Sequence, residues 1–109
     1  MTSRDYSAFA YPLPHPGEHL REDFLRQYGL TVGSLARAMG VRRTRIECLI
    51  GETQSITADT ALRLGRVFSM SADLWMDLQT AHDLSKTAIE AREALAAIKA
   101  LPVPAMEDA

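Results

Sequence analysis

Apolar residues recur at helical intervals through most of the chain. Beyond Pro16, one apolar face is formed by Leu20, Phe24, Leu25 and Tyr28, which follow i, i+4, i+5 and i+8 spacing. Gly29 is expected to end this helix, and the hydroxyls of Thr31, Thr57 and Ser71 are expected to cap later ones. The pattern predicts an all-α fold of five helices, at 16–28, 31–39, 42–50, 58–68 and 72–101.

The last two of these helices are expected to close the core. The residues assigned to the core face of the fourth helix are Ala61, Leu62, Gly65 and Phe68, and those of the fifth are Leu74, Trp75 and Leu78. Gly65 indicates that another element packs closely against the fourth helix.

A second apolar stripe follows on the fifth helix. With alternating spacings of three and four it runs through Ala81, Leu84, Ala88, Ala91, Leu95 and Ile98. The stripe either folds back on its own domain or packs against a second copy. Its length favours a homodimer, with a seam of Leu84, Ala88, Ala91, Leu95 and Ile98. Pro102 and Pro104 are expected to end the helix.

These elements divide the chain into four parts. Residues 1–14 contain aromatic residues and prolines without a period and are expected to form an irregular N-terminal arm. Residues 15–84 form the globular domain, residues 85–101 form a C-terminal helical extension that carries the dimer seam, and residues 102–109 form a loose tail.

The segment 34–49 has the features of a helix-turn-helix. Ala36 is small where a second helix crosses, Gly40 suits the left-handed turn after the first helix, and Ile46 points back to the shared core. Two helices joined by a glycine turn also occur without any role in DNA binding. The arginines at the start of the second helix nevertheless make duplex DNA the first partner to consider.

Composition limits the alternatives. A chain of 109 residues with 47% hydrophobic residues fits one compact domain. No apolar run approaches the roughly 20 residues of a membrane span, and the N-terminal residues do not read as a signal peptide, so we expect a cytoplasmic protein without membrane contact. The single cysteine, Cys48, excludes an internal disulfide.

Charge is distributed unevenly about a net value of −2. Residues 17–69 carry eight arginines against six acidic residues, whereas the rest of the chain carries four basic and eight acidic residues. The basic excess therefore coincides with the helix-turn-helix. Because it is small, we expect weak non-specific DNA affinity and a need for two copies acting together.

Enzyme chemistry finds little support in the sequence. His15 and His19 are four residues apart, but Pro16 and Gly17 place His15 outside the helix, so the pair does not form a zinc-binding face. His82 is interpreted as a packing residue. We expect no catalytic residues, no metal and no cofactor.

Four segments of the chain together resemble the HigA-type antitoxins of bacterial addiction modules. The segments are 15–25, which opens His-Pro-Gly-Glu, 35–41, 56–64, which opens Ile-Thr-Ala-Asp-Thr-Ala, and 74–79. The resemblance implies a five-helix, phage-repressor-like helix-turn-helix domain that dimerises and represses its own operon by binding operator DNA. It also implies a partner, a co-encoded HigB-type toxin that cleaves translated messenger RNA.

The chain departs from the family in its DNA-reading segment. Relatives commonly carry serine at the position of Arg42, asparagine at Thr44, and a basic Asn-Gly-Lys-Arg run where this chain has Gly-Glu-Thr-Gln at 51–54. Glu52 therefore stands where phosphate contacts are expected. For this reason the operator sequence of a relative does not predict the operator that this chain would bind.

Seven residues are candidates for DNA contact. Arg43 and Arg45 suit guanine or phosphate, Arg42 suits phosphate, and Thr44 suits a thymine methyl group. Glu47 can accept from a cytosine amino group, and Thr31 and Ser34 can contact the backbone at the start of the preceding helix. Two alternatives stay open: a toxin-binding module whose DNA face has decayed, and a solitary repressor without a toxin.

Overall fold

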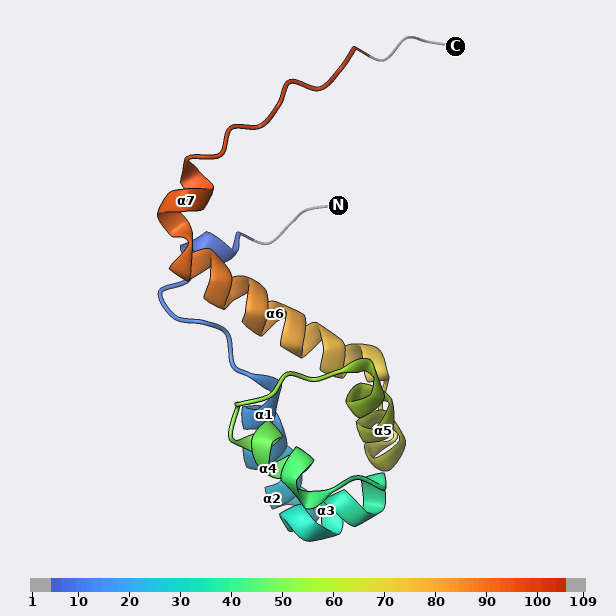
Figure 1. Ribbon diagram of the computed structural model, residues 1–109. Helices are drawn as coiled ribbons and strands as arrows, with labels where there is room; N and C mark the ends of the chain where they lie inside the picture. The colour runs from blue at the N-terminus through green and yellow to red at the C-terminus, as the bar shows by residue number, and fades with distance from the viewer. Residues whose placement is uncertain (1–4, 106–109) are drawn as a thin grey trace.

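The computed structural model describes residues 5–105, and within that range it is helical without a strand (Figure 1). Its elements are η1 (Tyr6–Ala8), α1 (Pro16–His19), the π-helical η2 (Leu20–Leu25), α2 (Arg26–Tyr28), α3 (Val32–Met39), α4 (Arg43–Ile50), α5 (Ala58–Phe68), α6 (Ala72–Glu90) and α7 (Arg92–Ala96). None of the described helices is long and apolar enough to cross a bilayer. The all-α prediction is confirmed.

The first predicted helix is present as one continuous run, in which α1 passes through η2 into α2. His15 caps its start, because the Nδ1 atom accepts a hydrogen bond from the Gly17 amide at 2.9 Å. Gly29 ends it in the left-handed conformation, with φ of 61°. Gly17 also allows close packing, since a Cβ atom there would lie 1.9 Å from the Leu49 carbonyl oxygen of α4.

Local sequence signals locate the later helix starts correctly. Thr31 and Ser34 form a reciprocal capping box at the start of α3. The Thr57 hydroxyl accepts from the Thr60 amide, and the Ser71 hydroxyl accepts from the Asp73 amide. Each of these bonds satisfies an amide that has no partner within its own helix.

The core lies between the first helical run, α3, α4, α5 and the start of α6. Its buried apolar residues are Leu20, Leu25, Leu35, Ala36, Met39, Ile46, Leu49, Ile56, Ala61, Leu64, Phe68 and Trp75. Three residues assigned to the core are instead exposed: Leu62, Leu74 and Tyr28. In α5 the buried face follows the 61, 64, 65, 68 register, and Leu62 lies outside it.

Gly65 packs as its small size predicts. A Cβ atom at this position would lie 2.7 Å from the Met70 carbonyl oxygen and 3.3 Å from the Ala72 amide nitrogen. The turn between α5 and α6 therefore folds tightly back over α5.

The C-terminal helical extension is shorter than expected. α6 ends at Glu90, Ala91 leaves helical geometry with φ of −103° and ψ of 20°, and α7 ends at Ala96. The prediction of helix up to residue 101 is therefore wrong. Residues 97–101 are exposed, so this segment lacks the packing that stabilises a short helix. In addition, Pro102 disfavours helical geometry at the residue before it.

The N-terminal arm lies along the C-terminal half of α6 (Figure 1). The Leu13 amide donates to the buried Ser85 hydroxyl at 2.8 Å, and the Leu13 carbonyl contacts His82 Nδ1 at 2.7 Å. Further out, Arg92 donates to the Phe9 carbonyl at 3.1 Å. The arm includes the short helix η1 as well as irregular chain, and parts of the predicted arm and tail, residues 1–4 and 106–109, lie outside the described residues.

Candidate nucleic-acid interface

α3 and α4 pack as a helix-turn-helix. Gly40 adopts φ of 69° after α3, and the Val41 amide donates back to the Ala36 carbonyl at 3.0 Å. Ile46 and Leu49 of α4 are buried against the core together with Ala36. The opposite face of α4 is therefore left to the solvent, and it is the face that carries the charged candidates.

The first turn of α4 presents two residues to the solvent without ion pairs. Arg42 is the N-cap residue, but its side chain makes no capping bond, and its guanidinium forms no ion pair within residues 5–105. Thr44, the second residue of α4, is exposed in the same turn. Both side chains are free to meet a ligand.

Arg43 is paired along its own helix. Its Nε atom donates to Glu47 Oε1 at 3.1 Å, in an i, i+4 ion pair whose two side chains are 69% and 52% exposed. Glu47 is thus a partner of Arg43 in the free protein, an arrangement that i, i+4 spacing favours on a helix surface.

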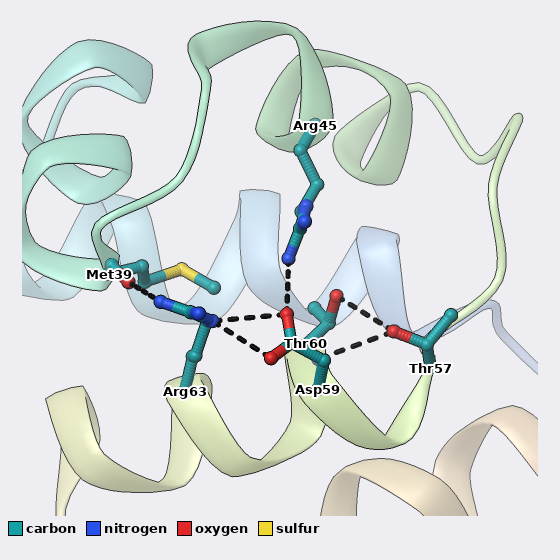
Figure 2. A network of polar contacts seen from close by, with 6 residues as sticks. All are labelled: Met39, Arg45, Thr57, Asp59, Thr60 and Arg63. Atoms are coloured by element: carbon teal, nitrogen blue, oxygen red, sulfur yellow. Dashed lines mark hydrogen bonds and ion pairs between the residues drawn. The ribbon is translucent and has the colours of Figure 1, made fainter.

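Arg45 reaches across to α5 instead. Its Nη1 atom lies 2.6 Å from Asp59 Oδ2, and Arg63 donates from Nε to both oxygens of the same carboxylate (Figure 2). Arg63 Nη1 then donates to the Met39 carbonyl, at the end of α3. The hydrogen bond from the Arg45 guanidinium lowers the pKa of Asp59 below its ordinary value, and the hydrogen bond from Arg63 lowers it further. This chain of contacts ties α3, α4 and α5 together.

A shallow pocket of about 390 Å³ opens beside this network. The residues that line it include Arg42, Arg45 and Arg63 together with Thr44 and Gln54. With one carboxylate, Asp59, beside three guanidiniums, the surface carries a local positive excess. A phosphate group is the kind of ligand that such a surface attracts.

Thr31 and Ser34 lie at the start of α3, next to Arg43. Their hydroxyls are engaged in the capping box: Thr31 Oγ1 accepts from the Ser34 amide at 3.1 Å, and Ser34 Oγ accepts from the Thr31 amide at 2.9 Å. An ideal Cβ on Gly33 would lie 3.8 Å from Arg43 Nη1, which places this helix end beside the α4 arginines. Because the Ser34 amide is taken by this cap, the amides of Val32 and Gly33 are the first-turn groups that suit a phosphate.

The loop after α4 is held by Arg21 of the first helical run. Arg21 Nη1 donates to the Ile50 carbonyl at the end of α4, and the same atom lies 3.5 Å from Glu52 Oε2. Glu52 adopts a left-handed conformation, with φ of 61°. Glu52 is therefore paired with the arginine that contacts the end of α4, a contact that was not predicted from the sequence.

His15 and His82 are structural residues. Their rings meet edge to face at 5.0 Å between centroids. Burial, and then the neighbouring His82, lower the pKa of His15 below its usual value. Neutral His15 is also the form whose Nδ1 can accept a hydrogen bond from the Gly17 amide. On His82, Nδ1 carries a proton, because the Leu13 carbonyl can only accept a hydrogen bond.

The structure thus places Arg42, Arg43, Thr44 and Glu47 on the exposed part of α4 and its N-cap, Arg45 half-buried on the side towards α5, and Thr31 and Ser34 beside them. The seam residues lie apart from this surface. Leu84 and Leu95 are 46% and 47% exposed and Ile98 is 70% exposed, whereas Ala88 and Ala91 are half-buried. Asp59 and Arg63 also belong to the candidate interface but were not predicted: their i, i+4 spacing on α5 is visible in the sequence, whereas the contact of Asp59 with Arg45 of α4 is not.

Known proteins are similar to this chain in both sequence and fold. The chain matches no family model. It is 49% identical over 73 residues to virulence-associated protein I of Dichelobacter nodosus, covering 67% of this chain and 68% of that protein. It is 37% identical over 71 residues to antitoxin HigA-1 of Vibrio cholerae, covering 65% of this chain and 67% of the antitoxin.

Similarity of fold extends over more of the chain than the two sequence alignments do. The structure of Pseudomonas aeruginosa antitoxin HigA with the higBA promoter superposes with a TM-score of 0.78 and 35% identity, over 83% of this chain and 99% of that one. The superposition thus covers a larger share of the chain than either sequence match does. The chain belongs to the HigA family of helix-turn-helix antitoxins.

Proposed function

We propose that this protein is a dimeric repressor that binds the operator of its own operon through α4 and neutralises a HigB-type toxin encoded beside it. The observation that carries the DNA-binding part is the exposed α4 face, where three arginines and Thr44 stand on a helix whose other face is buried. In repressors of this architecture the second helix of the motif lies in the major groove.

The surroundings of α4 support the same proposal. The Val32 and Gly33 amides of α3 suit a phosphate on one side, and Arg42 and Arg63, which line the pocket, suit another. The relative from Pseudomonas aeruginosa that shares the fold is a HigA antitoxin whose structure contains its higBA promoter.

The dimer is proposed to form through the exposed apolar residues of α6 and α7. Leu84 and Leu95 are about half exposed in the single chain, so pairing with a second copy would bury them. Two copies related by a twofold axis place two α4 helices on successive turns of the same DNA face, about 34 Å apart. We therefore expect a palindromic operator.

The experiment that tests DNA binding uses the DNA immediately upstream of the gene. Wild-type protein is expected to shift this duplex in a salt-dependent manner, and the Arg43→Ala/Arg45→Ala double variant is expected to bind it much more weakly. The control is an Arg26→Ala variant, which removes a guanidinium that pairs with Glu22 outside the interface. Equal operator affinity of wild type and double variant would refute the role of α4.

Binding of the toxin is tested separately. The gene next to this one is expected to encode a small ribonuclease that stops the growth of cells when it is expressed alone. Coexpression with this protein is expected to restore the growth of those cells and to yield a stable complex of the two proteins. A second candidate function is a toxin-binding module without DNA binding, which the pairing of Arg43 and Arg45 with carboxylates favours. A stable toxin complex without any promoter shift at low salt would support that second candidate.

A further inference from the structure

The two arginines best placed to read bases are each held by a carboxylate in the free protein. We propose that Asp59 and Glu47 determine DNA specificity by fixing Arg45 and Arg43 in orientations suited to guanine while opposing non-specific attraction to phosphate. This inference rests on the proposed DNA-binding function and names the residues that regulate it.

The geometry leaves a reading edge on each guanidinium. An arginine carries five N–H donors, and two of them on adjacent nitrogens are needed for a bidentate contact to guanine O6 and N7. Asp59 engages Nη1 of Arg45, which leaves the Nε and Nη2 edge for a base. Glu47 engages Nε of Arg43, which leaves the edge formed by Nη1 and Nη2.

Asp59 is itself held in place. Both of its oxygens accept from Arg63 Nε, at 3.1 and 3.0 Å, and Arg63 is anchored in turn on the Met39 carbonyl at 2.8 Å. Figure 2 shows Arg45 descending from α4 towards this carboxylate on α5. Arg45 is therefore positioned by the body of the domain rather than by its own helix.

The same carboxylates act differently on specific and non-specific DNA. A phosphate that approaches Arg43 or Arg45 also meets a negative charge a few ångströms behind the guanidinium, which reduces the attraction that dominates non-specific binding. At a matching guanine, the fixed orientation reduces the entropy lost on contact. Both effects increase the ratio of operator affinity to non-specific affinity.

The test compares Asp59→Asn and Glu47→Gln with wild type on two duplexes, the upstream DNA of the gene and a scrambled sequence of the same length and composition. We expect the affinity ratio to fall about tenfold for Asp59→Asn, because Arg63 also holds that carboxylate in place, and about threefold for Glu47→Gln, whose carboxylate pairs with Arg43 alone. For the scrambled duplex, the slope of log K against log salt is expected to become steeper by up to about 0.9 for each arginine released.

Asp77→Asn is the matched control, because Asp77 is an exposed residue of α6 and its replacement changes the net charge equally. It is expected to leave the ratio unchanged. If Asp59→Asn and Glu47→Gln keep the wild-type ratio, or if Asp77→Asn lowers it equally, the inference is wrong although DNA binding stands. If wild type does not prefer the upstream duplex, the proposed function fails first.

A measurement without DNA tests the positioning directly. In nitrogen-15 NMR spectra of the free protein, hindered rotation of the Arg45 guanidinium is expected in wild type and loss of that hindrance in Asp59→Asn. Arg42, which has no ion pair in residues 5–105, provides the mobile reference in the same spectra. Rotation of Arg45 as fast as that of Arg42 in wild type would overturn the inference whatever the DNA results.

Discussion

Replacing Gly17 by alanine tests whether the glycine of the His-Pro-Gly-Glu segment is needed for α1 to pack closely against α4. The added Cβ would lie 1.9 Å from the Leu49 carbonyl oxygen and 2.9 Å from the Leu49 carbonyl carbon. The first distance is about 1.5 Å short of the 3.4 Å at which ordinary contact begins, and both atoms belong to the backbone of α4. No side chain can turn aside to relieve the contact, so either α1 or the end of α4 has to move.

The expected cost follows from that geometry. Overpacking a well-packed core costs roughly 1–3 kcal/mol, and a clash with rigid backbone belongs at the upper end, about 3 kcal/mol. For a domain of this size each kcal/mol lowers the melting temperature by roughly 4–8 °C. Gly17→Ala is therefore expected to melt at least about 12 °C below wild type, or to fail to fold.

Thermal and urea unfolding followed by circular dichroism measure this effect. The matched control is Gly33→Ala, where no atom lies closer to the added Cβ than Arg43 Nη1 at 3.8 Å. Alanine is the better helix former, so this variant is expected to melt at or above the wild-type temperature. A Gly17→Ala protein that melts within about 2 °C of wild type would refute the close approach of α1 to α4.

Three further predictions concern the seam, the buried histidine and a helix cap. Leu95→Glu is expected to give monomers in sedimentation with helicity retained, whereas Leu101→Glu, outside the helices, is expected to leave the dimer intact; a dimeric Leu95→Glu protein would place the interface elsewhere. Because the pKa of His15 is lowered in the folded state, the unfolded state binds the additional proton first, so unfolding free energy is expected to be level above about pH 6.5 and to fall below it. His15→Asn, which keeps a capping acceptor but does not titrate, is expected to lose much of that fall, and an unchanged pH profile would contradict the assignment. Thr57→Ala removes the acceptor for the Thr60 amide and is expected to cost about 1 kcal/mol in urea unfolding; no loss would mean that water satisfies this amide equally well.

Local features were predictable from the sequence because their causes are local. A hydroxyl before an apolar run and a glycine after it determine helix ends through bonds that span three or four residues, as at Thr31, Thr57 and Gly40. The cluster of arginines could be identified in the same way, since Arg42, Arg43 and Arg45 lie at the N-cap and in the first turn of one helix.

What the sequence did not reveal depends on contacts between distant segments. Leu62 and Leu64 are equally apolar, and Leu64 is the buried one because it lies on the 61, 64, 65, 68 face that packs against the rest of the domain. The pairing of Arg45 with Asp59 joins residues 14 positions apart, and the docking of Leu13 on Ser85 joins residues 72 apart. Such pairs arise from the tertiary arrangement, and a single sequence does not record them.

The link between Arg45 and Asp59 has a consequence for protein engineering. Specificity is often redesigned by transplanting a recognition helix from one repressor into another. Here a graft limited to 43–50 would leave behind the carboxylate that orients one of its arginines, because Asp59 lies on the next helix. The transferable unit is therefore α4 together with the first turns of α5, and chimaeras need to exchange both.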